Sequence, residues 1–123
     1  MTYQNIYDYA LSLLGETADS AGMDDYLARA PLLLAGIVSR LSELSHMLSL
    51  DSPAVAPAAS VTLGDDFALD ARLMHPAGIM LASELIFDEQ PELSASLGER
   101  AKSELSRLSG SATTIGRIRE VYE

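Results

Sequence analysis

The chain has 123 residues, of which 48% are hydrophobic and only 6% aromatic, and it carries a net charge of −10 with no cysteine. A chain of this length forms one domain, and its shortage of aromatic residues leaves an aliphatic core that favours helices over strands. The lack of cysteine excludes a disulfide scaffold and a thiolate metal site, and the excess of acid leaves no electrostatic footprint for binding nucleic acid.

The start of the chain lacks the basic segment of a secretion signal, since residues 2–5 are Thr-Tyr-Gln-Asn. The apolar runs, such as residues 31–38, are far too short to span a bilayer. We therefore expect a soluble protein with no membrane partner.

The first expected helix covers residues 3–14. Thr2 is suited to be its N-cap, and Gly15 is suited to end it. Small and acidic residues then predict a loop over residues 16–22. The 3-4-3 spacing of one helix face is kept by Tyr3, Ile6, Ala10 and Leu13.

A second helix is expected to begin at Asp24 as N-cap, with Pro31 producing a kink or a short preceding turn. Alternating steps of three and four predict a bundle seam. The seam consists of Leu27, Ala30, Leu34, Ile37, Leu41, Leu44 and Leu48. Residues 51–64, which are rich in proline and alanine, predict a long loop, with residues 61–63 as a possible scrap of strand.

The third helix is apolar almost all the way round. It is expected to start near Asp70, to become regular at about Met74 because of Pro76, and to stop at residues 88–90. Glu84 is the only charged residue from Leu73 to Phe87. A helix apolar on every side must be buried on every side, so this one is either the central helix of a small bundle or part of a subunit contact.

Glu84 has two open interpretations. A buried carboxylate needs a partner, which Arg29, Arg40 or a neighbouring subunit would supply. Alternatively, Glu84 marks the one side of the helix that faces solvent. We treat Glu84 as a candidate interface residue.

A fourth helix is expected from Pro91, its first residue, to Gly110, which closes it. The chain then divides into a helical domain over residues 1–110 and a C-terminal arm over residues 111–123, which is either a last helical turn or an extended arm. The candidate interface residues of the arm are Ile115, Arg117, Ile118, Arg119, Val121 and Tyr122.

No group of residues carries a catalytic signature, so we expect no enzyme, no cofactor and no metal. Asp65, Asp66 and Asp70 resemble half of a divalent-cation site, but turn formation and capping of the third helix explain them better. His46 and His75 lie on different helices, and no strained-turn serine motif supports a catalytic relay.

Four stretches resemble the small helical head–tail connector, or adaptor, proteins of tailed bacteriophages and prophages. Residues 6–16 (IYDYALSLLGE) are similar to their first helix, and residues 26–31 (YLARAP) resemble the start of their second. Residues 65–73 (DDFALDARL), continued to residue 85, resemble their turn and central helix, and residues 118–122 (IREVY) their terminal motif. The resemblance spans most of the chain, but none of it is a chemical signature.

The resemblance implies an all-α, four-helix bundle-like protein of the virion neck, present in the host cytoplasm before assembly. It implies a homo-oligomeric ring of about a dozen subunits that contacts the portal protein and a tail-side neck protein. DNA would pass through the ring without tight binding, and the net negative charge fits such a channel. The alternative is a non-viral helical protein–protein interaction module without catalysis.

Overall fold

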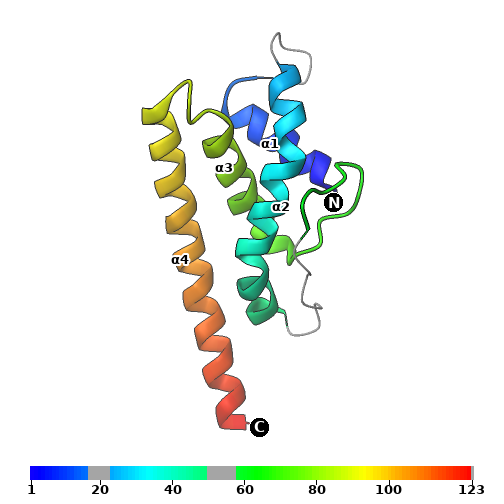
Figure 1. Cartoon of the computed structure of the whole chain (residues 1–123). Helices are drawn as coiled ribbons and strands as arrows, with labels where there is room; N and C mark the ends of the chain where they lie inside the picture. The colour runs from blue at the N-terminus through cyan, green and yellow to red at the C-terminus, as the bar shows by residue number, and fades with distance from the viewer. Residues whose placement is uncertain (17–22, 50–57, 123) are drawn as a thin grey trace.

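The computed structural model of the chain describes residues 1–16, 23–49 and 58–122, with side chains for all of these except residues 23 and 111–122. Its helices are α1 (Tyr3–Leu13), α2 (Met23–Leu48), α3 (Met74–Leu85) and α4 (Pro91–Tyr122), with the short 3₁₀ helix η1 (Ala71–Leu73) leading into α3. Figure 1 shows α2 and α4 running in the same direction with α3 between them. The predicted all-α, bundle-like fold is confirmed.

The core is built around α3, which contacts α1, α2 and α4. Ile79, Leu81 and Ala82 are fully buried and Leu85 is nearly so, as expected for a central helix. Phe87 was expected to be buried as well, but it is 64% exposed. It lies in the turn at residues 86–89, because α3 ends at Leu85 and not at residues 88–90 as predicted.

The seam of α2 is confirmed over most of its length: Ala30, Leu34, Ile37, Leu41 and Leu48 are buried and Leu44 is partly so. Leu27 is an exception at 48% exposure, because Tyr26 and Arg29, on other sides of the helix, face the end of α3. Pro31 lies inside the continuous helix and does not follow a separate short turn.

The N-terminus of α1 is held by its own cap and by a distant loop segment. Thr2 and Asn5 form the reciprocal hydrogen bonds of a capping box, which confirms Thr2 as N-cap. The amides of Tyr3 and Gln4 donate to the carbonyls of Asp65 (3.0 Å) and Leu63 (2.7 Å). These bonds satisfy two amides that a helix start leaves unpaired.

The sequence predictions for three segments outside the helices have different outcomes. Residues 61–63 do not form a strand, and within the described residues the extended chain makes only an isolated bridge between Thr2 and Asp66. Of the loop predicted at residues 51–64, residues 51–57 lie outside the described residues, and residues 58–64 form neither helix nor strand. Most of the loop predicted at residues 16–22, namely residues 17–22, also lies outside the described residues.

The predicted end of the fourth helix at Gly110 is wrong, because α4 continues without a break to Tyr122. Glycine in a helix interior costs about 1 kcal/mol relative to alanine, which is too little to end a helix whose neighbouring residues favour it. Residues 111–122 are therefore helical and continue the axis of α4 past the end of α2 (Figure 1). This segment, the described part of the C-terminal arm, adds about 18 Å at 1.5 Å per residue.

Candidate functional site

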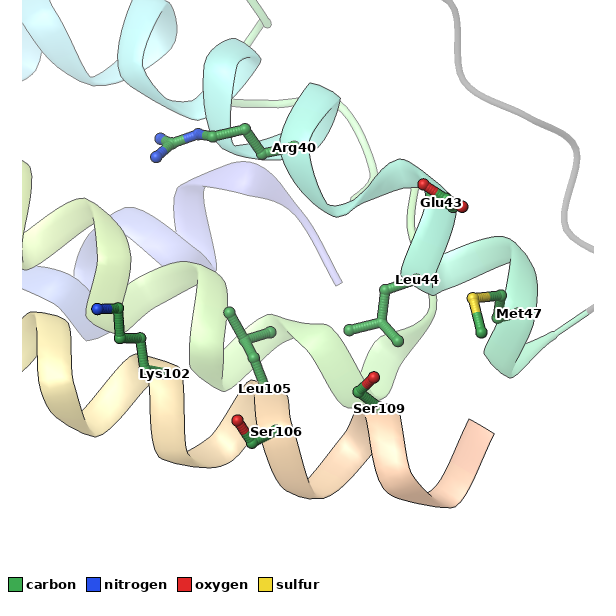
Figure 2. A pocket seen from close by; sticks show the side chains of 8 residues that line it. All are labelled: Arg40, Glu43, Leu44, Met47, Lys102, Leu105, Ser106 and Ser109. Atoms are coloured by element: carbon green, nitrogen blue, oxygen red, sulfur yellow. The ribbon is translucent and has the colours of Figure 1, made fainter. Parts of the chain in front are cut away.

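An open groove with a volume of about 570 Å³ lies between α2 and α4. Leu44 and Met47 from α2 and Leu105 from α4 give it an apolar base (Figure 2). Charged residues Arg40, Glu43 and Lys102 and the small residues Ser106 and Ser109 complete the lining. An apolar base with a charged rim is typical of a protein-binding surface.

A second hollow continues this one towards the start of α4 and shares Arg40, Lys102 and Leu105 with it. Its other lining residues are Met80, Ser83, Glu84, Gly98 and Ala101. We call the two hollows together the α2–α4 groove. On α4 the groove extends from Gly98 to Ser109, where small side chains leave room for a neighbouring helix to approach.

Glu84 lies on the wall of this groove and is paired with Arg40, as one of the sequence interpretations expected. The Arg40 Nη2 atom donates to Glu84 Oε1 at 2.5 Å, and the Glu84 side chain is 30% exposed. Its other carboxylate oxygen, Oε2, is buried without a hydrogen-bond partner in the described part of the chain. Arg29 donates instead to the backbone carbonyls of Glu84 (3.2 Å) and Leu85 (3.3 Å), which fixes α2 on the end of α3.

The other candidate interface residues all fall on the arm. Ile115, Arg117, Ile118, Arg119, Val121 and Tyr122 belong to the last part of α4, and their side chains lie outside the described ones. The structure thus brings Glu84 to the groove and places the other six positions on a helical extension beyond the groove.

The clusters considered for chemistry are explained by capping and packing. Within the described residues no three His, Asp or Glu side chains are placed to hold a metal. Asp70 caps η1 and pairs with Arg72, whose hydrogen bonds hold the pKa of the Asp70 carboxyl below its ordinary value. His46 and His75 are exposed on different helices, and the His75 ring packs edge-on against Tyr9 at 4.7 Å.

Acidic residues gather at the end of the bundle opposite the arm, where α1 ends, α2 begins and α3 turns into α4. Tyr26 donates to Glu89 Oε2 at 2.8 Å, and burial, this hydrogen bond and the nearby charges raise the pKa of Tyr26 to about 12. The acids at this end are Glu16, Asp24, Asp25, Asp88, Glu89 and Glu92.

Sequence reasoning did not find the groove. Lys102 drew no site prediction from the sequence, and Leu44 was interpreted only as part of the seam. The available signal was the recurrence of Gly98, Lys102, Leu105 and Ser109 on one side of α4, but such a mixture of small, charged and apolar residues is ordinary for a surface.

No helix in the described ranges combines the length and apolarity needed to cross a lipid bilayer. Comparisons with protein-family models, with curated proteins and with solved structures gave no match. The function must therefore be inferred from the residues and geometry of this chain.

Proposed function

We propose that this protein is a non-catalytic assembly protein, a head–tail connector of a tailed bacteriophage or prophage. Copies of the chain would form a ring below the portal protein, with a tail-side neck protein on its other face and DNA passing through. The sequence resemblance of residues 6–16, 26–31, 65–85 and 118–122 supports the viral role.

The observation that carries the assembly role is the form of α4. This 32-residue helix packs on α3 in its first part, and its residues 111–122 extend past the end of α2. An isolated helix of about 12 residues is only marginally stable in water. The arm, which has that length, is therefore stabilised best when a partner covers it. The apolar residues on the arm give such a partner something to bind.

The charge distribution supports the passage of DNA without tight binding. Residues 1–71 hold ten acids and two bases, and the acids at the end of the bundle opposite the arm have few cations near them. A surface with this sign repels a polyanion over a distance of about one Debye length, 8–10 Å at physiological salt.

The proposal is tested by mixing the purified chain with the portal protein encoded in the same genome and imaging the mixture by cryo-electron microscopy. We expect rings of this chain stacked coaxially on portal rings, with the arms at subunit or portal contacts. Portal rings that stay bare at micromolar concentrations of both proteins would contradict the connector role. Self-assembly in that case would favour the alternative, a non-viral helical interaction module.

A further inference from the structure

We infer that the α2–α4 groove is the docking site for the C-terminal arm of a second copy of this chain, in a one-way, head-to-tail contact. The inference rests on the proposed function only in that copies of the chain assemble with one another. It adds which surfaces meet, and it holds for any self-assembling role of the protein.

The groove and the arm match in length. On α4 the groove extends from Gly98 to Ser109, and the arm helix extends from residue 111 to residue 122. Each is twelve residues long, or about 18 Å of helix. An arm from another copy therefore fills the groove from end to end.

The chemistry of the two surfaces is also complementary. The groove offers Leu44, Met47 and Leu105 as an apolar base, and the arm carries Ile115, Ile118 and Tyr122 at spacings of three and four residues, which places these positions on one helix face. Arg117 and Arg119 make the arm a source of hydrogen-bond donors. The exposed carboxylate of Glu43, in the groove lining, is an acceptor for them.

The two surfaces lie on opposite sides of α4, which decides the symmetry of the contact. Ile115 follows Ser106 by nine residues and Ile118 follows Ser109 by nine, and nine residues are two and a half helical turns. A reciprocal two-fold pair of straight α4 helices would need both surfaces on the same side. A head-to-tail contact has no such requirement, and its repetition gives a ring when it closes.

The lack of cysteine in the chain allows a direct test by pairwise cross-linking of single-cysteine variants of the full-length protein. Ser106→Cys places a thiol in the groove, and Thr114→Cys places one on the arm, four residues before Ile118 and therefore on the same face. Thr113→Cys is the matched control, because it is the same substitution one residue earlier and faces away from Ile118. Thermal melting followed by circular dichroism checks that each variant is folded.

We expect a mixture of Ser106→Cys and Thr114→Cys to cross-link with a short bismaleimide at least tenfold faster than a mixture of Ser106→Cys and Thr113→Cys. The mass of the unmodified chain in analytical ultracentrifugation should rise with concentration past twice 13.1 kDa. Equal cross-linking of both mixtures would overturn the groove as the docking site, and a mass that stops at two copies would overturn the one-way contact. Specific cross-linking without binding to portal rings would uphold the inference and contradict the connector role.

Discussion

Gly78 determines how closely α1 approaches α3. A Cβ atom at this position would collide with Cδ1 of the Tyr9 ring, which is itself packed on His75. Gly36, in the interior of α2, has open space where its Cβ would be. The two glycines therefore provide opposite predictions for the same substitution.

Gly78→Ala should lower the free energy of unfolding by about 1–3 kcal/mol, because an overpacked helix contact forces side chains and backbone to shift. Gly36→Ala should raise it by about 0.5–1 kcal/mol, because it removes the flexibility of glycine from a helix interior. Urea denaturation of both variants measures this. A Gly78→Ala protein as stable as Gly36→Ala would show that α1 does not pack on α3 as described.

Asp70 makes the stability of the fold depend on pH. Its side chain is 12% exposed, and the hydrogen bonds from Arg72 hold the pKa of its carboxyl below the ordinary value. The lowered pKa of Asp70 contributes to the free energy of unfolding at any pH above the ordinary pKa of an aspartate. As the pH falls, the unfolded chain binds the proton first, and the contribution is lost by the time the pH passes the lower pKa of the folded state. Arg72 also donates to the carbonyl of Leu48 at 2.8 Å, which ties the end of α2 to the same pair.

Asp70→Asn keeps a side chain that can cap η1 but removes the titrating group. We expect the variant to be less stable than the natural chain at pH 7 and the difference to shrink between about pH 5 and pH 2. Urea denaturation midpoints of the variant and of the natural chain, measured across this range, give two curves of stability against pH. Parallel curves would contradict a stabilising role for the Asp70 charge.

At the scale of elements, α4 is the feature that decides how the molecule presents its arm. Gly110 lies between the part of α4 that packs on α3 and the arm that extends beyond α2, and the space around its Cβ position is open. A rigid helical connection directs the arm along the axis of α4, whereas a hinge at Gly110 would let it swing.

Gly110→Ala should increase the helical circular dichroism signal, because alanine favours a helix interior by about 1 kcal/mol over glycine. Gly110→Pro should remove helix from the arm, since proline cannot donate the hydrogen bond and collides with the preceding turn. Neither substitution should move the melting temperature of the bundle by more than about 2 °C, because neither touches the core. A large loss of stability in Gly110→Pro would mean that the arm packs on its own bundle.

The elements that the sequence predicted well are those governed by local rules. Thr2 as N-cap, Gly15 with its positive φ of 73° at the end of α1, and Pro91 as the first residue of α4 follow from the chemistry of helix ends. Gly110 was misread because a glycine that ends one helix is tolerated inside another, and context decides between the two.

Features that depend on distant parts of the chain were not predictable from spacing. The bonds from Tyr3 and Gln4 to the loop at residues 63–65, and the groove formed where α2 and α4 flank α3, arise only when the helices meet. Of the candidate site, Glu84 was found because a lone carboxylate on an apolar helix is conspicuous in any sequence.

Across the whole molecule, the group of six acids at residues 16, 24, 25, 88, 89 and 92 and the arm lie at opposite ends of the long axis of the bundle (Figure 1). The arm carries Arg117 and Arg119 against Glu120 and Glu123, so it is close to neutral in an otherwise acidic chain. This polarity favours an ordered, one-directional contact between copies and weakens like-to-like contact of the acidic ends by charge repulsion.

We propose that the protein assembles through its arm and that residues 1–110 fold independently of the arm. The most direct measurement compares the full chain with a version ending at Gly110, by thermal melting and by analytical ultracentrifugation at matched concentrations. We predict that the shortened chain melts within about 2 °C of the full chain and stays monomeric at concentrations where the full chain associates. A shortened chain that still associates, or one that melts several degrees lower as a monomer, would contradict the claim.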